Sequence, residues 1–303
     1  MNILYLAKPR YGGWITFTAH LSLLKKYPIF KITKKGEKKH RPFGYSTDYR
    51  NINIEELKSM DNIIISAIDK NFYQYLEYIE DATIVIHDPT ELKPALLAHL
   101  ERFNIITIRE SVQHFLMDFF GISSVFIPHP FYCFPREPCP KDGAISISRI
   151  DYDKHTDIIL KANEGLEKPI LIYGAVNDLY VYHKLKDLDF KHYYKGSFPK
   201  CFEKLKTLLE PMRYCIDMSV IKKDGGGSQY TFLEAIYCDC ILVINKKWVD
   251  NMPTEFVDGI NCIVVKDHYD LIYKLTCFNK EYFDMITMNA RLMLDKHIKP
   301  ELW

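Results

Sequence analysis

The chain has no long hydrophobic run and no excess of charge of either sign. Within its 303 residues, no stretch approaches the roughly 18 apolar residues that a membrane-spanning helix needs. Residues 2–7 form an apolar run that ends at Lys8, Pro9 and Arg10, which is too short for the core of a signal peptide. We therefore expect a cytoplasmic protein without a membrane span. The net charge of +1 argues against a general binder of nucleic acids or anionic membrane surfaces.

Clustered cysteines are also lacking. The eight cysteines are scattered, Cys238 and Cys240 are the closest pair, and no Cys-x-x-Cys occurs. This spacing argues against a zinc site and predicts reduced thiols in a cytosol-like compartment.

What the sequence does contain is apolar residues, at 48%, in a length that predicts two domains. Short apolar runs in the first half alternate with segments of helical spacing, and this alternation predicts a parallel sheet with helices on both faces. A charged stretch at 34–40 predicts a solvated loop. The predicted strands are 2–7, 28–33, 62–67, 83–88, 105–111 and 124–128, and the predicted helices are 14–25, 71–80, 92–103 and 112–120.

Residues 128–140 contain five prolines and predict a connection between domains. The α/β pattern then restarts, with predicted strands at 144–148, 169–174, 191–194, 213–218, 241–244 and 262–265. The predicted helices are 156–163, 198–209, 230–238, 268–278 and 280–297. We predict domains at 1–132 and 143–282, a linker at 133–142 and a closing helical segment at 283–303. Two such domains predict a cleft between the carboxyl ends of their strands, where these sheets bind ligands.

One stretch of the second half combines glycines, a helix start and a carboxylate. Gly225, Gly226 and Gly227 precede a predicted helix that carries Glu234 about one turn further on. Glycines in this position allow close approach of the backbone to an anion, which the helix N-terminus then holds. The alternative is a glycine-rich turn that caps an ordinary helix. The residues that would surround the anion are Gly226, Gly227, Ser228, Gln229, Tyr230 and Thr231.

A second glycine pair, Gly12 and Gly13, lies between the first predicted strand and helix. It does not form a Gly-x-Gly-x-x-Gly sequence, so a dinucleotide site is not predicted. These glycines either permit the turn or let a ligand approach.

Three features of the second half occur in a familiar order. Ser148-Arg149-Ile150-Asp151-Tyr152-Asp153-Lys154 comes first, the glycine loop with Glu234 follows, and Phe256-Val257-Asp258-Gly259-Ile260-Asn261 closes the set. This order resembles retaining GT-B glycosyltransferases of the GT4-like family, also called glycosyl transferases group 1. The resemblance covers residues 144–265 well and is only architectural over the first domain. It implies two Rossmann-like domains with parallel sheets that face a cleft, and a closing helix that packs back on the first domain.

The resemblance also implies roles for individual residues. Arg149 and Lys154 match the cationic pair on the donor diphosphate, which gains charge as the glycosidic bond breaks; the alternative is two solvated surface cations. Glu234 matches the carboxylate that accepts the ribose hydroxyls. Gly226 stands where the family has a first glutamate beside the sugar. Asp224 is the candidate substitute, and backbone amides from Gly226 to Ser228 are the other.

Further candidates come from the first domain and from one loop. His87 matches a histidine that the family places near the reactive carbon of the sugar, or it simply bonds to neighbouring backbone. We therefore group His87 and Asp224 with Arg149 and Lys154 as catalytic candidates. Arg109 and His129 are acceptor-side candidates at the predicted cleft, and Phe198 either packs against the donor base or belongs to the core.

The implied activity is the retaining transfer of a hexose, with GDP-mannose as the first expected donor and a UDP-hexose as the second. The acceptor would be a glycan, a glycoprotein or, as a weaker expectation, modified DNA. No cofactor and no metal are expected, because no Asp-x-Asp is expected at a cleft position and Arg149 and Lys154 supply positive charge. The compact length and the abundance of Lys, Ile and Tyr resemble versions from large DNA viruses (chlorovirus-like) or phages. Whether the chain forms a homodimer is left open.

Two other functions are compatible with these residues. The glycine at position 226 would also suit a catalytically inactive GT-B protein that binds a nucleotide sugar or acts as a scaffold. A phosphatase or epimerase that acts on a nucleotide sugar would instead require a pair of carboxylates or histidines in the cleft.

Overall fold

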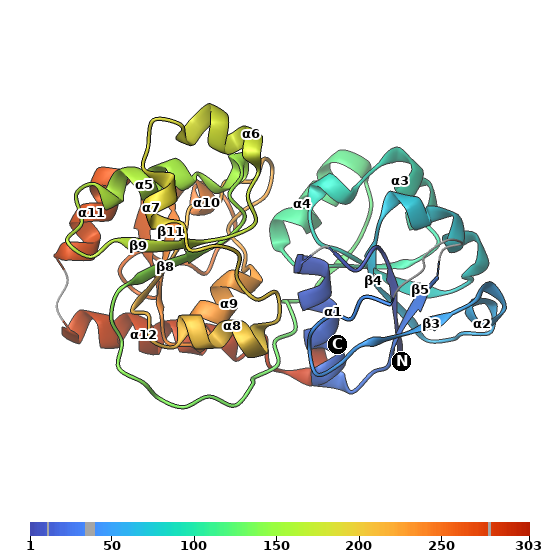
Figure 1. The fold of residues 1–303 in the computed structure, drawn as a ribbon. Helices are drawn as coiled ribbons and strands as arrows, with labels where there is room; N and C mark the ends of the chain where they lie inside the picture. Colours follow the sequence, from blue (N-terminus) through green and yellow to red (C-terminus); the bar gives the residue numbers. More distant parts are fainter. Residues whose placement is uncertain (11, 34–39, 278–279) are drawn as a thin grey trace. The chain divides into compact units, whose positions relative to one another are not determined.

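The computed structural model describes residues 1–10, 12–33, 40–277 and 280–303 (Figure 1). Most of the loop expected at 34–40 and the end of the helix expected at 268–278 lie outside the described residues. The chain forms two compact units. Unit 1 comprises residues 1–133 and 296–303, and unit 2 comprises residues 134–295.

Unit 1 is built on a seven-stranded sheet in the order β3-β2-β1-β4-β5-β6-β7. Every pairing in this sheet is parallel, and Ile3 of β1 is in register with Ile29 of β2 on one side and Ile64 of β4 on the other. The strands are β1 Asn2–Leu6, β2 Ile29–Ile32, β3 Tyr49–Ile52, β4 Ile63–Ile68, β5 Ala82–Ile86, β6 Asn104–Thr107 and β7 Val125–Phe126. Continuous apolar runs such as β4, which is buried along its whole length, suit strands that are covered on both faces.

The helices of unit 1 supply that cover. Helix α1 packs against β1 and β4, while residues of the later helices share one apolar core with alternate residues of the strands, such as Leu4 and Leu6. The α-helices are α1 Gly12–Lys25, α2 Ile54–Lys58, α3 Pro94–Leu100 and α4 Glu110–Phe120. The 3-10 helices are η1 Lys70–Tyr78, η2 Pro89–Glu91 and η5 Pro300–Leu302.

The last residues of the chain are tied to unit 1. His297 donates from Nδ1 to the carbonyl of His129 at 2.7 Å, and Trp303 donates from Nε1 to the carbonyl of Pro128 at 3.0 Å. The Trp303 ring also meets the Phe17 ring edge-on, with centroids 5.3 Å apart. These contacts fix residues 296–303 against the body of the unit.

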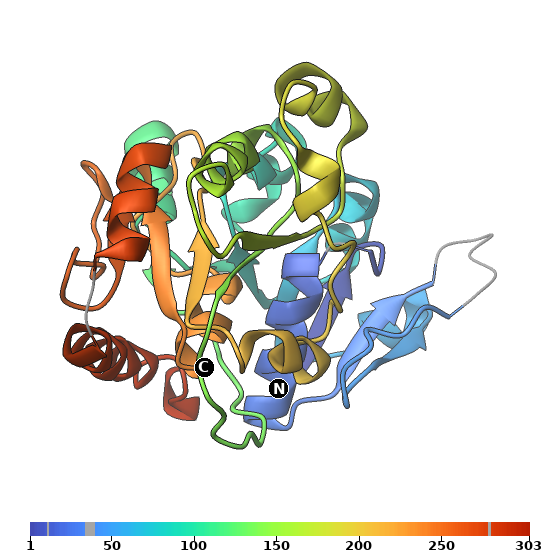
Figure 2. The same cartoon turned by 60° about the vertical axis from the view of Figure 1, so that its left-hand side comes forward.

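Unit 2 is built on a five-stranded parallel sheet in the order β12-β11-β10-β8-β9 (Figure 2). The strands are β8 Ala144–Ile147, β9 Ile170–Tyr173, β10 Tyr214–Asp217, β11 Ile241–Asn245 and β12 Ile263–Val265. Figure 1 shows α5 and α11 on one side of this sheet and α8, α9 and α12 on the other.

The helices of unit 2 are mostly short. They are α5 Thr156–Asn163, α6 Asp178–Tyr180, α7 Phe190–Tyr193, α8 Phe202–Leu209, α9 Tyr230–Tyr237, α10 Lys246–Val249, α11 His268–Thr276 and α12 Lys280–Leu294. A 3-10 turn η3 spans Tyr152–Lys154, and a π-helical turn η4 spans Val181–Leu185. Residues 127–142 form an extended segment without regular structure, the green loop at the bottom of Figures 1 and 2.

The structure differs from the sequence-based prediction in several places. Residues 191–194 were expected as a strand, but Phe190–Tyr193 is the helical turn α7, and the Phe190 ring stacks on Tyr194 at 4.9 Å. Strand β3 and helix α2 were not expected. Helix α12 packs on α9 and β11 within unit 2, so only residues 296–303 of the expected closing helical segment 283–303 belong to unit 1.

Each sheet has one point where the strand order reverses. In unit 1 it lies between β1 and β4, and in unit 2 it lies between β8 and β10. At such a point the connections leave in opposite directions, which opens a crevice at the carboxyl ends of the two strands.

Candidate functional site

A buried polar chain spans the reversal point of unit 2. Lys154, which is 8% exposed, follows β8 and donates from Nζ to Ser219 Oγ at 2.6 Å. The Ser219 hydroxyl and backbone N–H both donate to one oxygen of Asp217, the last residue of β10. The other oxygen of Asp217 is buried and has no hydrogen-bond partner among the described residues. The loops after the two neighbouring strands are thus joined through one ammonium group.

Arg149 lies beside Lys154 on the same loop but is much more exposed. Its guanidinium contacts Asp151 at 3.2 Å and Asp153 at 2.9 Å, and 61% of its side chain is accessible. Asp153 also lies 4.0 Å from Lys154 Nζ. The two carboxylates therefore offset much of the positive charge that the sequence predicted here. Asp151-Tyr152-Asp153 is an Asp-x-Asp sequence, and the structure places it at this edge, whereas none was expected at a cleft position.

The glycine loop packs tightly against its own chain. The Gly226 N–H donates to the carbonyl of Trp248 at 2.6 Å, and Trp248 Nε1 donates to the carbonyl of Gly227 at 3.0 Å. A Cβ added at Gly226 would lie 2.1 Å from the carbonyl oxygen of Pro253, and its φ of +71° favours glycine. The close approach that requires glycine at 226 is therefore an approach to residues 248–253, and the Gly226 N–H is already used.

Helix α9 begins directly after this loop, with Gln229 as its N-cap residue. The Gln229 side chain makes no capping bond, and its Nε2 is buried without a hydrogen-bond partner among the described residues. Further along the helix, Glu234 is only 5% exposed, and burial raises the pKa of its carboxyl to about 8. No side chain or backbone group in the described parts of the chain hydrogen-bonds that carboxyl, so Glu234 has unused acceptor capacity in a partly neutral group.

The other candidate site residues of unit 2 are buried or half-buried. Asp224 is 2% exposed, and its N–H donates to the carbonyl of Ile221 at 3.2 Å. Phe198 is half-buried in the loop before α8. That loop is held near the end of β9 because the Gly174 N–H donates to the Gly196 carbonyl at 2.9 Å. Ser228 is buried, and Tyr230 and Thr231 form the first turn of α9.

In unit 1, His87 lies directly after β5. Its Nε2 donates to the carbonyl of Ser66 at 2.8 Å, which is the backbone bond considered as the alternative role. That bond leaves Nδ1 as the unprotonated nitrogen, and burial lowers the pKa of the ring to about 4. His87 is therefore a neutral acceptor near pH 7.

Two further polar residues follow neighbouring strands of the same sheet. Arg109, after β6, is 6% exposed and donates to the carbonyl of His87 at 2.6 Å. His129, after β7, is 3% exposed, and burial and the Arg109 charge hold its pKa well below the usual range. Arg109 thus joins two of these loops.

Glu91, which no sequence pattern identified, also lies at this edge of the unit 1 sheet. Glu91 accepts from Trp14 Nε1 at 2.7 Å and from the His87 N–H at 2.9 Å, and burial raises the pKa of its carboxyl well above the usual range. Gly12 and Gly13 open α1 at the same edge, and a Cβ at either position would meet no atom within 4 Å. Unlike Gly226, these glycines are not required by neighbouring chain.

Sequence patterns therefore predicted the site residues that belong to a motif and missed the site residues that do not. Asp217, Ser219 and Glu91 belong to no motif. The available signal for Asp217 was an acidic residue inside an apolar strand, Tyr214–Asp217. Among the described residues, no helix is long and apolar enough to cross a membrane, and no cluster of three or more His, Cys, Asp or Glu side chains is placed to hold a metal ion.

No protein-family model and no curated protein matches the sequence, but solved structures match the fold. Anabaena HepE, in complex with UDP and glucose, is 13% identical, covers 99% of this chain and 96% of its own, and has a TM-score of 0.73. An alpha-glucosyltransferase in complex with UDP and a 13-mer DNA containing an HMU base is 13% identical, covers 97% and 95%, and has a TM-score of 0.69. S. aureus TarM, in complex with fondaparinux, alpha-GlcNAc-glycerol and UDP, is 13% identical, covers 79% and 53%, and has a TM-score of 0.60. The chain therefore has the GT-B fold, with two Rossmann-like α/β units.

Proposed function

We propose that this protein is a retaining glycosyltransferase that moves a hexose from a nucleoside-diphosphate sugar to a hydroxyl acceptor. The observation that carries the proposal is Glu234, a buried carboxyl that no described group hydrogen-bonds, on the helix that follows the glycine loop. A carboxyl in this state is poorly solvated, and a ligand that brings two hydroxyl donors, as a ribose does, would supply the missing bonds.

The cations at the reversal point suit the diphosphate. Lys154 is held by Ser219 through one N–H and keeps two other donors for oxygen ligands. Arg149 is exposed enough to leave Asp151 and Asp153 and turn toward a phosphate, where bidentate contact is available. Because the two aspartates compete for it, Arg149 contributes less than a guanidinium without acidic neighbours would.

The chemical step needs no nucleophile from the protein. The bond between the sugar C1 and the diphosphate oxygen breaks, and its electron pair leaves with the diphosphate. The acceptor oxygen attacks C1 from the same face, and its proton passes to a diphosphate oxygen, which gives a glycoside of retained configuration and a nucleoside diphosphate. Arg149 and Lys154 stabilise the charge that develops on the leaving group.

Unit 1 supplies the acceptor-side groups in this proposal. Neutral His87 accepts a hydrogen bond from a sugar or acceptor hydroxyl through Nδ1, and Arg109 and His129 contact the acceptor. Asp224 is buried within its own loop, and the Gly226 amide is used, so neither is assigned to the sugar. The Gly227 and Ser228 backbone and Gln229 Nε2 are better placed for it, and Phe198 is assigned to the base.

The donor we favour is a UDP-sugar, ahead of GDP-mannose, because the similar structures described above contain UDP. The acceptor class is a glycan, a glycoprotein or modified DNA. The structural match to a glucosyltransferase bound to DNA supports the third class, while the net charge of +1 opposes it. The reaction is proposed to proceed without a metal ion.

The test is calorimetric titration of the full chain with UDP, UDP-glucose, GDP and GDP-mannose, each with Mg²⁺ and with EDTA. We expect one uridine site that persists in EDTA and is weakened in Arg149→Ala and in Lys154→Met. Arg50→Gln, a surface arginine paired with Glu56, serves as the control. Failure of all four ligands to bind would overturn the proposal, and binding only with Mg²⁺ would assign Asp151 and Asp153 to a metal ion.

A second function is supported by the glycine at position 226, where the family has its first glutamate, and by the burial of Asp224. A catalytically inactive protein would bind the donor without turning it over. Release of free sugar from UDP-glucose during long incubation without acceptor identifies the transferase. Tight binding with no hydrolysis and no transfer identifies the inactive binder.

A further inference from the structure

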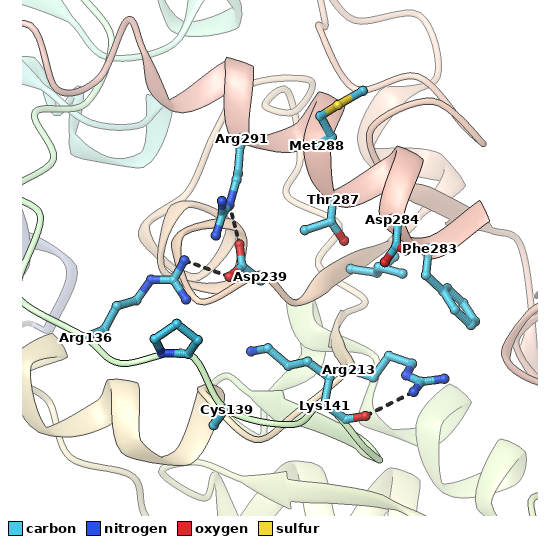
Figure 3. Close-up of a pocket in the computed structure, with 12 residues that line it drawn as sticks. Arg136, Cys139, Lys141, Arg213, Asp239, Phe283, Asp284, Thr287, Met288 and Arg291 are labelled. Carbon is cyan, nitrogen blue, oxygen red and sulfur yellow. Dashed lines mark hydrogen bonds and ion pairs between the residues drawn. The ribbon is translucent and has the colours of Figure 1, made fainter. Parts of the chain in front are cut away.

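Unit 2 contains a cavity of about 530 Å³ that the proposed activity does not use (Figure 3). Three parts of the unit form its walls: the extended segment before β8, the starts of β10 and β11, and one face of α12. The lining residues are Arg136, Pro138, Cys139, Lys141, Arg213, Asp239, Ile241, Phe283, Asp284, Thr287, Met288 and Arg291.

The cavity lies at the opposite end of the sheet from Lys154. Arg213 and Ile241 mark the starts of β10 and β11, whereas Ser219 follows the end of β10. A four-residue parallel strand is roughly 13 Å long, so a ligand in this cavity is distinct from one at the carboxyl ends of the strands.

Asp239 divides its carboxylate between two arginines. One oxygen accepts from Arg136 at 2.7 Å, and the other accepts from Arg291 Nε. Asp239 holds this position with a positive φ of +58° at the turn between α9 and β11. Neither guanidinium therefore receives the bidentate partner that it can accommodate, and two positive charges share one negative charge.

Most of the donors on these arginines have no partner among the described residues. A guanidinium carries five N–H donors, and Arg136, Arg213 and Arg291 each make one hydrogen bond to another described residue. Arg213 instead lies over the Phe283 ring, with 5.0 Å between the guanidinium carbon and the ring centroid. The lining thus has four cations against the two carboxylates of Asp239 and Asp284.

Lys141, unlike the three arginines, hydrogen-bonds to the ends of two helices. Its Nζ donates to the carbonyls of Glu210 and Cys238, the C-cap residues of α8 and α9. A cation at these helix ends compensates the partial negative charge of the terminal carbonyls. Arg136 and Arg291 therefore remain as the pair with free donors around a shared carboxylate.

We propose that this cavity binds a small molecule that carries a phosphate monoester. The phosphate contacts the free edges of Arg136 and Arg291 while Asp239 keeps its bond to each. A phosphate suits the pair because it offers three oxygens and up to two negative charges, so it can bridge two guanidinium groups. Thr287, one turn before Arg291 on α12, adds a side-chain hydroxyl to the cavity lining (Figure 3). The cavity volume falls in the range of small-molecule sites, and Pro138, Ile241 and Met288 give the organic part an apolar wall.

The test is titration of the full chain with inorganic phosphate, a hexose 6-phosphate and UMP, in the presence and absence of saturating UDP. We expect one saturable site that remains when UDP is bound. A tighter hexose phosphate indicates a sugar-phosphate ligand, and a tighter UMP indicates a nucleotide ligand.

Two variants that should weaken phosphate-ester binding and one that should tighten it make this test specific. Arg291→Gln and Arg136→Gln should each weaken binding at least tenfold. Asp239→Asn should tighten binding, because asparagine tolerates the positive φ and frees both arginines. Lys168→Gln, which alters an exposed cation of the same unit, serves as the control and should change nothing.

The proposal would be overturned by no saturable binding of any of the three probes at millimolar concentration, by displacement of the probe by UDP, or by equal binding by wild type and Arg291→Gln. Loss of binding in Asp239→Asn with an unchanged melting temperature would also overturn it. Arg149→Ala separates this site from the proposed transferase site. It should weaken UDP binding and leave phosphate-ester binding intact.

Discussion

The ammonium nitrogen of Lys154 lies 2.6 Å from the hydroxyl oxygen of Ser219, across the point where the strand order of unit 2 reverses. The two residues are 65 positions apart in the chain and follow neighbouring strands. Because the Ser219 hydroxyl donates to Asp217, its oxygen presents a lone pair to Lys154. The bond holds the ammonium in a defined position before any ligand arrives.

Replacing Lys154 by methionine should weaken UDP binding by about 10- to 100-fold, because a charge-assisted hydrogen bond contributes about 1.5–3 kcal/mol. Ser219→Ala, which keeps the charge but releases the ammonium, should have a smaller effect in the same direction. Calorimetry measures both. Equal affinity of Lys154→Met and wild type would show that Lys154 does not contact the diphosphate.

Glu234 should make the protein less stable as the pH rises. Its pKa is about 8 in the folded state and 4.5 ordinarily, so between these values the folded protein binds more protons than the unfolded chain. Stability is lost progressively from pH 4.5 to pH 8, by up to about 5 kcal/mol at 1.36 kcal/mol per pKa unit. Glu234→Gln should remove this loss and still weaken UDP binding. Urea unfolding between pH 5 and pH 9 measures the first effect, with the exposed Glu203→Gln as control. If the free energy of unfolding changed with pH in the same way in wild type and in Glu234→Gln, the assignment of this pH dependence to Glu234 would be refuted.

His297 should have the opposite effect in acid. Burial lowers its pKa from 6.5 to about 4, so below pH 6.5 the unfolded chain gains a proton that the folded protein resists. Stability should fall from pH 6.5 to pH 4, by up to about 3 kcal/mol for this group. His20 and His87 act in the same sense. His297→Asn keeps a donor for the His129 carbonyl and should show a shallower acid loss, while the exposed His183→Asn should match wild type. Thermal melting from pH 4 to pH 7 decides this.

Two glycines should respond differently to alanine. Gly226→Ala should cost at least about 3 kcal/mol, because it combines a positive φ with overlap on the Pro253 carbonyl. Gly13→Ala should leave the melting temperature unchanged or slightly raised, since nothing lies near the new methyl group and alanine favours helix. If a ligand approaches here, Gly13→Ala should lower turnover about tenfold. Full turnover would mean that Gly13 serves only the turn.

Most strands could be predicted because a strand covered on both faces is a continuous apolar run. Strand β3 could not, since Arg50 and Asn51 in its middle are exposed at the sheet edge. Residues 191–194 were misassigned because Tyr193 and Tyr194 favour strands in isolation, whereas the Phe190–Tyr194 contact favours a helical turn.

The candidate site, like the fold, could be predicted from the sequence only in part. A glycine indicates that something passes close to the backbone, but not what, so residues 248–253 could not be foreseen as the neighbour of Gly226. Arg149 was found from its position after a strand, but its pairing with Asp151 and Asp153 was not predicted. The link from Lys154 to Ser219 and Asp217 depends on which strands are adjacent, and no local pattern specifies that.

Helix α9 begins at the glycine loop and ends beside Asp239, so both proposed ligands meet opposite ends of one element only about 12 Å long. Thermodynamic linkage then applies. If occupation of the cavity at Asp239 changes the affinity for a ligand at the glycine loop, that ligand must change the affinity at the cavity by the same factor. An axial shift of α9 would be sufficient to carry such coupling, without any change in the sheet beneath it.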